Sequence, residues 1–269
     1  MHFTHIKLKP TKKITKNFIM SDAIKDVEIP EESKQISRNF YKTNKLSDEL
    51  GYDLLLEMDD SIIYAFDYLN DKRKIIIPEL NPTTIFYSNA AMFHRNLMNS
   101  KKMLLEQSPS YKELNKHPLD PKIFGNFFQF AINCLISLQS TIESFANRQI
   151  PENYFTNEKG EEYDVSIFHK IDTVLPIIKE KKFKREFKRD NSRVRKVIEL
   201  RNEIIHLKPI KDTTNTQYKD TYRKMIKFDF PRAIIAVKNF VNFYEPELIE
   251  ECVCGKEYYY DLEIMEKNE

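Results

Sequence analysis

The sequence predicts a mainly α-helical protein, a helical bundle preceded by a small β-rich extension. From residue 83 onward, apolar residues recur at helical spacing over several long stretches. Residues 2–80 instead hold short runs rich in β-branched and aromatic residues. Only four glycines occur in 269 residues, which disfavours a turn-rich β-barrel. We therefore expect a β-rich extension over residues 1–82, a helical domain over 83–249 and a strand or tail over 250–269.

Four runs in the extension have the composition of β-strands. They cover residues 2–9, 52–58, 61–69 and 73–80. Asp59 and Asp60 separate the second run from the third in the manner of a tight turn. Residues 52–69 are therefore expected to form a hairpin.

Two long helices are expected next. The first follows Pro82, with Thr83 and Thr84 in its N-cap region. The second should run from Asp120 to Arg148, because an Asp before a Pro favours a helix start and apolar residues continue at helical spacing.

The rest of the helical domain is more broken. A helical stretch begins after Asp164, its expected cap, and Pro176 should kink or interrupt it. A further helix spans residues 191–207 and must end near Pro209. A last helix is expected over residues 221–243. The tail has β-type composition and is expected to pair with the N-terminal strands.

Composition narrows the function only broadly. The 43 basic residues nearly cancel the 41 acidic ones, so net charge alone indicates no polyanionic partner. No glycine-rich phosphate loop occurs. The N-terminus lacks the apolar core of a signal peptide, and no apolar run is long enough to span a membrane. We expect a cytoplasmic protein with no membrane partner.

The cysteines indicate neither a disulfide framework nor a metal site. Cys134, Cys252 and Cys254 form an odd set, which is typical of a reducing compartment. A zinc site at Cys252 and Cys254 would need distant Cys134 or a histidine as further ligands. No metal and no cofactor is therefore expected.

One helix carries a cluster suited to phosphate chemistry. Its apolar stripe consists of Val194, Val197, Ile198, Ile204 and Ile205. Arg201 falls inside that stripe, and an unpaired buried guanidinium is costly because it keeps its charge. Asn202 and His206 are four residues apart, so they share a helical face that the Arg201 side chain can reach. Arginine grips phosphoryl oxygens, histidine moves protons near neutral pH, and asparagine orients a hydroxyl or a phosphate.

The same region is strongly basic. Residues 179–211 contain thirteen Lys or Arg against five Asp or Glu, a local balance of +8. Such a patch attracts a nucleic-acid backbone through counterion release. The alternative is a solvated, lysine-rich helix face. The residues expected to bind RNA are Lys184, Arg185, Lys188, Arg189, Arg193, Arg195, Lys196 and Lys208.

These motifs resemble the HEPN superfamily. The sequence RNEIIH at 201–206 fits the HEPN pattern of Arg, a polar residue, three further residues and His. The segment at 135–151 is similar to the HEPN helix that carries a Glu and ends in an Asn before a Pro-containing loop. The resemblance covers about residues 84–244 and implies a HEPN-like helical bundle.

The resemblance also implies an activity. HEPN proteins of this type are metal-independent endoribonucleases that act as homodimers, often as toxins or abortive-infection effectors in anti-phage defence. By this resemblance, His206 acts as general base or acid at the ribose 2′-hydroxyl and Arg201 stabilises the charged phosphorane. Asn202 holds the phosphate or polarises the motif, and the product carries a 2′,3′-cyclic phosphate. An antitoxin or another regulatory protein is a possible partner in this family.

Glu143 is a candidate for the carboxylate that pairs with Arg201 from the neighbouring helix, since a desolvated Arg needs such a partner. A surface glutamate without that role is the alternative.

Two other functions stay open. Many HEPN-like proteins bind RNA or a protein partner without cutting RNA. A DNA-binding regulator is less compatible with the sequence, because the apolar stripe occupies a face that a recognition helix needs free.

Overall fold

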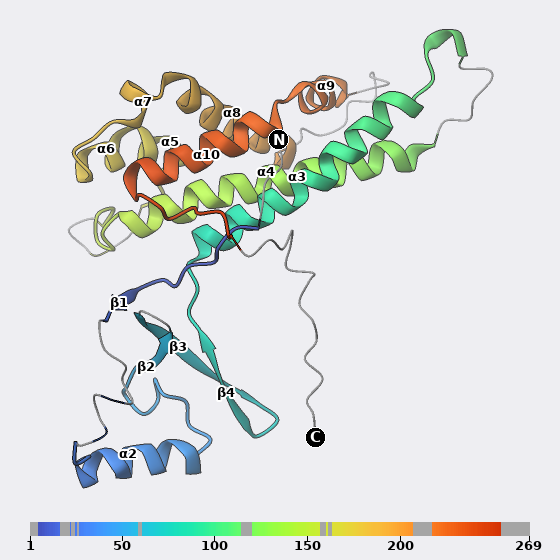
Figure 1. Ribbon diagram of the computed structural model, residues 1–269. Coiled ribbons are helices and arrows are strands. Elements are labelled where there is room, and N and C mark those ends of the chain that lie inside the picture. Colours follow the sequence, from blue (N-terminus) through green and yellow to red (C-terminus); the bar gives the residue numbers. More distant parts are fainter. Residues whose placement is uncertain are drawn as a thin grey trace. The chain divides into compact units, whose positions relative to one another are not determined.

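The computed structural model describes residues 5–16, 22, 25, 27–58, 61–113, 120–156, 160, 163–206 and 217–253. They are mainly helical, with a small antiparallel sheet (Figure 1). The chain divides into two compact units, one of residues 8–81 and one of residues 82–269 together with residues 1–7. Residues 5–7 thus go with the helices and not with the expected extension.

The first unit is built on a four-stranded sheet around one long central strand. Strand β3 (Ser61–Asn70) pairs antiparallel with β1 (Lys13–Thr15), β2 (Leu54–Met58) and β4 (Arg73–Pro78). Met58 pairs with Ser61, so the expected β2–β3 hairpin is confirmed, while Asp59 and Asp60 lie outside the described residues.

The first strand, expected over residues 2–9, is not formed over its described part, residues 5–9. In its described part only Ile6 forms a bridge, to Glu251, and Pro10 forms another to Leu80. Proline has no N–H to donate to a ladder, so pairing at Pro10 is limited to this isolated bridge, with hydrogen bonds made by its neighbours Lys9 and Thr11. The regular strand begins later, at Lys13.

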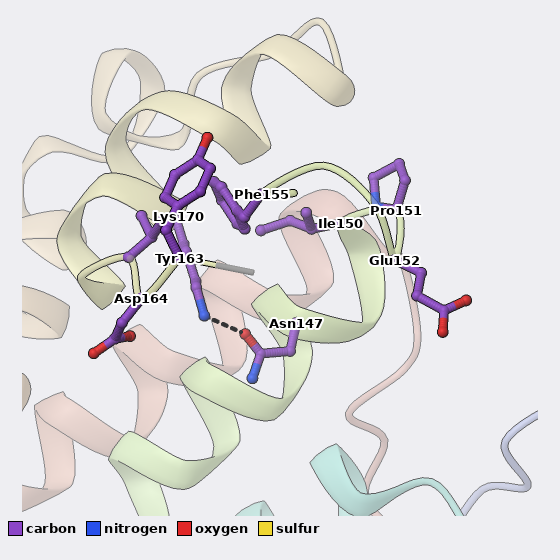
Figure 2. Close-up of a pocket in the computed structure, with 9 residues that line it drawn as sticks. Asn147, Ile150, Pro151, Glu152, Phe155, Tyr163, Asp164 and Lys170 are labelled. Carbon is purple, nitrogen blue, oxygen red and sulfur yellow. Dashed lines mark hydrogen bonds between the residues drawn. The ribbon is translucent and has the colours of Figure 1, made fainter. Parts of the chain in front are cut away.

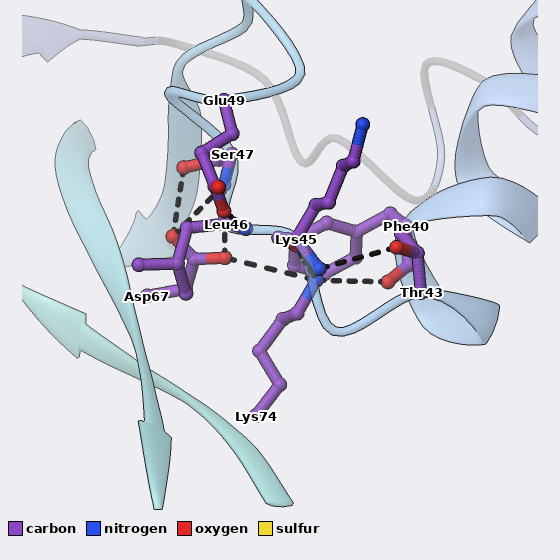
Figure 3. A network of polar contacts seen from close by, with 8 residues as sticks. All are labelled: Phe40, Thr43, Lys45, Leu46, Ser47, Glu49, Asp67 and Lys74. Carbon is purple, nitrogen blue, oxygen red and sulfur yellow. Dashed lines mark hydrogen bonds and ion pairs between the residues drawn. The ribbon is translucent and has the colours of Figure 1, made fainter. Parts of the chain in front are cut away.

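Helix α2 (Glu31–Lys42) was not predicted, because it contains only three apolar residues and only Phe40 is buried. A polar network fastens the chain after it to the sheet (Figure 3). Asp67 on β3 is buried and accepts hydrogen bonds from the Ser47 N–H and, at 2.8 Å, from the Ser47 hydroxyl. Lys74 on β4 lies 3.9 Å from Asp67 and donates to the carbonyl oxygens of Phe40 and Lys45. A loop with little apolar surface is thereby held by polar contacts.

The helical unit contains four main helices. They are α3 (Pro82–Gln107), α4 (Pro121–Gln149), α8 (Lys188–Ile205) and α10 (Phe230–Tyr244). The long helices α3 and α4 lie side by side, and α8 and α10 pack on the same core (Figure 1). The buried Tyr87 hydroxyl of α3 donates to the Ile234 carbonyl of α10 at 3.2 Å, which satisfies two polar groups inside this core.

Shorter elements connect these helices. They are η1 (Tyr111–Glu113), α5 (Ile167–His169), the π-helical turn η2 (Lys170–Val174), α6 (Leu175–Ile178), α7 (Phe183–Glu186) and α9 (Lys219–Lys227). The π-helical turn ends at Val174 and α6 continues through Pro176, so the stretch is irregular before the proline but is not interrupted by it. None of the described helices is both long and apolar enough to cross a membrane.

The helix caps follow the sequence only in part. Asp120 caps α4 as expected and accepts from the Lys122 N–H at 2.9 Å. Thr83 and Thr84, expected in the N-cap region of α3, lie in its first turn and are buried. The prediction that Asp164 caps the next helical stretch is wrong, because Ser166 caps α5 by accepting from the His169 N–H.

The expected single helix over 221–243 is two helices, α9 and α10. Asp229 caps α10 by accepting from the Arg232 N–H at 3.2 Å, and Pro231 occupies its first turn. A Pro there cannot donate to the preceding turn, so it ends α9 while the apolar pattern continues.

The C-terminal segment pairs with the N-terminal one over a short stretch. The Lys7 N–H donates to the Glu250 carbonyl at 2.9 Å, and the Cys252 N–H donates to the His5 carbonyl at 2.6 Å. The pairing expected for the tail is confirmed at residues 250–252. The rest of the expected strand, including Tyr258–Tyr260, lies outside the described residues.

Candidate functional site on helix α8

Helix α8 carries the Arg201 cluster and packs on the core through one face. Val194, Val197, Ile198 and Ile204 of the expected stripe are buried, and Leu200 joins them. Ile205 was expected in the stripe but is exposed in the last turn. The helix starts at Lys188, three residues earlier than expected.

Arg201 is half-buried and has no carboxylate partner among the described residues. One guanidinium nitrogen, Nη1, donates to the Asn202 Oδ1 at 3.2 Å. The Nε atom is buried and has no hydrogen-bond partner in the described structure. Because the guanidinium keeps its charge, this arrangement favours an anion as its missing partner.

His206 lies just beyond the last helical residue. Its backbone N–H donates to the Asn202 carbonyl at 3.0 Å, and its side chain is exposed. Residues four apart on a helix have Cβ atoms about 5 to 6 Å from each other, so the imidazole can reach the Asn202 surface. Of the predicted trio, Arg201 and Asn202 are in contact and His206 stands one turn further on.

Glu143 does not serve Arg201 in this structure. Its carboxylate accepts a 2.6 Å hydrogen bond from Gln139 on the same helix, and no ion pair joins it to Arg201. The expected Glu143–Arg201 pair is thus not formed.

The direction of the helices explains this result. Near the start of α8, Arg195 forms an ion pair with Asp172, and Lys170 of the same π-helical turn donates to Asn147 near the end of α4. The end of α4 therefore lies toward the start of α8, as in antiparallel helices (Figure 1).

The contacts between the end of α8 and the start of α4 show the same antiparallel direction. Glu203, near the end of α8, forms an ion pair with Lys224 of α9 at 2.8 Å. Tyr222 of α9 packs edge-on against Phe124 and Phe128, near the start of α4. Arg201 thus faces the early part of α4, and Glu143 lies too far along that helix.

The basic residues expected to bind RNA fall into two groups. Arg193 pairs with Asp190 at 2.6 Å, and Arg195 pairs with Asp172 while stacking on Phe168, so both are half-buried structural cations. The others that the structure describes are exposed, namely Lys184, Arg185, Lys188, Arg189 and Lys196. Lys208 lies outside the described residues.

Two pockets lie in the helical unit. The larger, about 570 Å³, is next to the loop after α4, where Lys170 donates to the Asn147 Oδ1 at 2.9 Å and Glu152 and Asp164 stand at the rim (Figure 2). The smaller, about 390 Å³, opens beside the start of α8. Neither of the two is lined by a residue of the Arg201 cluster, which lies on the surface of this single chain.

Metal ligands do not gather in the described ranges, where no group of three or more His, Cys, Asp or Glu could hold an ion. Cys134 is buried in the core, and burial raises the pKa of its thiol above the ordinary value. Cys252 is half-buried, and Cys254 lies outside the described residues.

Comparisons with protein-family models, with curated proteins and with solved structures found no match to this chain.

Proposed function

We propose that the protein is a metal-independent endoribonuclease of the HEPN type, whose active site is formed by Arg201, Asn202 and His206. The observation that carries the proposal is the half-buried Arg201 guanidinium, which has an unpartnered Nε and no carboxylate partner among the described residues. It lies beside Asn202 and one turn before an exposed His206.

Each residue has a role that its position allows. The Arg201 guanidinium stabilises negative charge on the phosphorane as the ribose 2′-hydroxyl attacks phosphorus. The exposed His206 imidazole removes the 2′-hydroxyl proton or returns a proton to the leaving 5′-oxygen. Asn202 holds the guanidinium in place through its Oδ1. The products are a 2′,3′-cyclic phosphate and a 5′-hydroxyl, and DNA is not a substrate because it lacks the attacking group.

The proposal includes a homodimer. The Arg201 cluster lines neither of the two pockets described above, so neither of them supplies a cleft for the substrate at this cluster. A second copy that brings its own cluster opposite the first would supply a cleft. A role in bacterial defence, as a toxin with a regulatory protein partner, follows from the HEPN resemblance.

A non-catalytic RNA-binding module is the second candidate. His206 favours it, because no described residue accepts from or donates to its ring, and a general base is normally oriented by such a bond. The two candidates share the basic surface and differ in whether RNA is cut.

The test is incubation of the purified chain with total RNA and with a matched DNA in the presence of EDTA. The double variant Arg201→Ala with His206→Ala should lose RNA cleavage. A matched double variant, Arg223→Ala with His169→Ala, removes an exposed Arg and an exposed His elsewhere and should retain it. Intact RNA bound equally by the unaltered chain and by the Arg201 variant would instead favour the binding module.

A further inference from the structure

The smaller pocket, beside the start of α8, has the composition of an anion site. Lys182, Lys184, Arg185 and Lys188 stand on its rim, and all four side chains are exposed. Its one carboxylate, Asp172, is already neutralised by an ion pair with Arg195. The rim therefore carries an excess of positive charge.

The floor of the pocket is apolar and buried. It is formed by Ile171, Pro176 and Phe183, with the Tyr244 ring beside them. Ligand pockets commonly combine such a floor with a few polar groups, and their volumes begin at roughly 300 Å³. The volume of about 390 Å³ therefore suits one small organic group attached to the anion.

A buried polar side chain also lines this pocket. Asn191 is only 7% exposed, and its side-chain amide makes no hydrogen bond to any residue that the structure describes. Its amide is not among the buried side-chain atoms that lack a partner, so it is open to the pocket and can donate its N–H to a ligand there.

Two further groups of donors belong to elements that line the pocket. Phe187, the residue before α8, provides no side-chain cap for the first N–H groups of that helix, whose dipole favours a negative charge. The Tyr244 hydroxyl accepts from the Phe183 N–H at 3.4 Å, which leaves its own proton to donate. Burial raises the pKa of Tyr244, so this hydroxyl keeps its proton at neutral pH.

We propose that this pocket binds the phosphate group of a nucleotide. Asn191, Lys184 and Lys188 contact the phosphate, and the apolar floor takes the attached sugar or base. Lys188 and Arg201 are thirteen residues apart on one helix, or about 20 Å at 1.5 Å per residue, so the pocket is separate from the Arg201 cluster.

The nucleotide can come from two sources, a free mononucleotide or a residue of a bound RNA. Only the second rests on the proposed ribonuclease function, where the pocket would hold the substrate some nucleotides away from the scissile bond. The phosphate site itself stands whether or not the chain cuts RNA.

Titration calorimetry on the full chain tests the proposal, with adenosine 5′-monophosphate as the probe and adenosine as its phosphate-free control. The chain should bind the monophosphate at least tenfold more tightly than adenosine. Asn191→Asp keeps the side-chain volume and places a carboxylate in the first turn of a helix, which the dipole tolerates. It should weaken monophosphate binding at least tenfold, because it sets a negative charge against the phosphate.

A second variant keeps the test decisive if Asn191→Asp fails to fold. Lys184→Ala with Lys188→Ala should also weaken binding at least tenfold, whereas the exposed control pair Lys102→Ala with Lys122→Ala should leave it unchanged. Absence of monophosphate binding, or equal binding by all these variants, would overturn the proposal.

Competition between RNA and the monophosphate distinguishes the two sources of the nucleotide. It is measured in the double variant Arg201→Ala with His206→Ala, which cannot cut RNA by the proposed mechanism. A short single-stranded RNA that displaces the monophosphate assigns the pocket to RNA, and an RNA that does not displace it assigns the pocket to a free nucleotide. Loss of cleavage in this background with retained monophosphate binding separates the two proposals.

Discussion

Asp67 shows how a single buried carboxylate holds a polar loop. The Asp67 side chain is 3% exposed, and it is satisfied by the Ser47 N–H, the Ser47 hydroxyl and the Lys74 ammonium 3.9 Å away. Lys74 in turn donates to two carbonyls and lies 3.9 Å from the Phe40 ring centroid. Such networks stabilise only while every member has its partners.

We predict that Asp67→Ala destabilises the sheet unit by about 3 kcal/mol, because it leaves a mostly buried ammonium without its carboxylate. Lys74→Met should cost less, since Asp67 keeps both bonds from Ser47. Hydrogen exchange at the Ser47 amide, which donates to Asp67, reports the change directly. Equal protection of this amide in Asp67→Ala and in the unaltered chain would contradict the role given to Asp67.

His94 makes stability depend on pH. Burial of this α3 residue lowers the pKa of its imidazole from 6.5 to about 4. Between these values the unfolded chain binds a proton that the folded chain does not, so the free energy of unfolding falls as pH drops from about 6.5 to about 4.

Urea unfolding at several pH values measures this slope. His94→Gln, which cannot titrate, should show a shallower fall over the same window. A slope identical in the variant and the unaltered chain would mean that other groups cause the acid sensitivity.

At the scale of secondary-structure elements, the sequence predicted the helices with a strong apolar period and the strands with β-type composition. The strands β2, β3 and β4 and the helices α3, α4 and α8 lie close to their expected positions. The helices and β3 bury apolar residues, whereas β2 and β4 have no buried residue and were marked by their β-type composition. Helix α2 has only three apolar residues and buries one of them, which was too few to predict a helix. The break between α9 and α10 was missed because apolar residues continue through it, and only Asp229 and Pro231 indicate a new start.

The cap at Asp229 gives a prediction for α10. Asp229→Ala removes the side chain that accepts from the Arg232 N–H and should lower the free energy of unfolding by about 1 kcal/mol. Asp220→Ala is a matched control, because Asp220 lies on α9 in an exposed pair with Arg223 and such pairs contribute about 0 to 1 kcal/mol. Denaturant midpoints of the two variants are compared. A larger loss in Asp220→Ala than in Asp229→Ala would contradict the assigned cap.

The composition of the candidate site stays a prediction. Arg201 and Asn202 are in contact, while His206 lies beyond the last helical residue, so spacing along the helix places it only one turn further on. A partner from another helix depends on packing direction, and the antiparallel α4 and α8 place Glu143 away from Arg201. The pocket lined by Asn191 was not predicted, because it joins η2, α7, α8 and α10, which only the tertiary fold brings together.

At the scale of the whole molecule, the proposed activity needs two chains. We predict a dimer in solution, with twice the 32.2 kDa mass of one chain. Light scattering coupled to size-exclusion chromatography measures this mass at several protein concentrations. A mass of one chain at every concentration at which RNA is cleaved would contradict a site shared between two subunits.

The most direct test of the central claim is cleavage of one defined RNA oligonucleotide in EDTA, with the end groups identified by mass spectrometry. The account predicts fragments with 2′,3′-cyclic phosphates and 5′-hydroxyls from the unaltered chain. It also predicts a rate lowered about 100- to 1,000-fold in Arg201→Ala, the range found when one transition-state donor is removed. Cleavage that leaves 3′-hydroxyl ends, or that proceeds at the same rate in Arg201→Ala, would contradict an active site at Arg201.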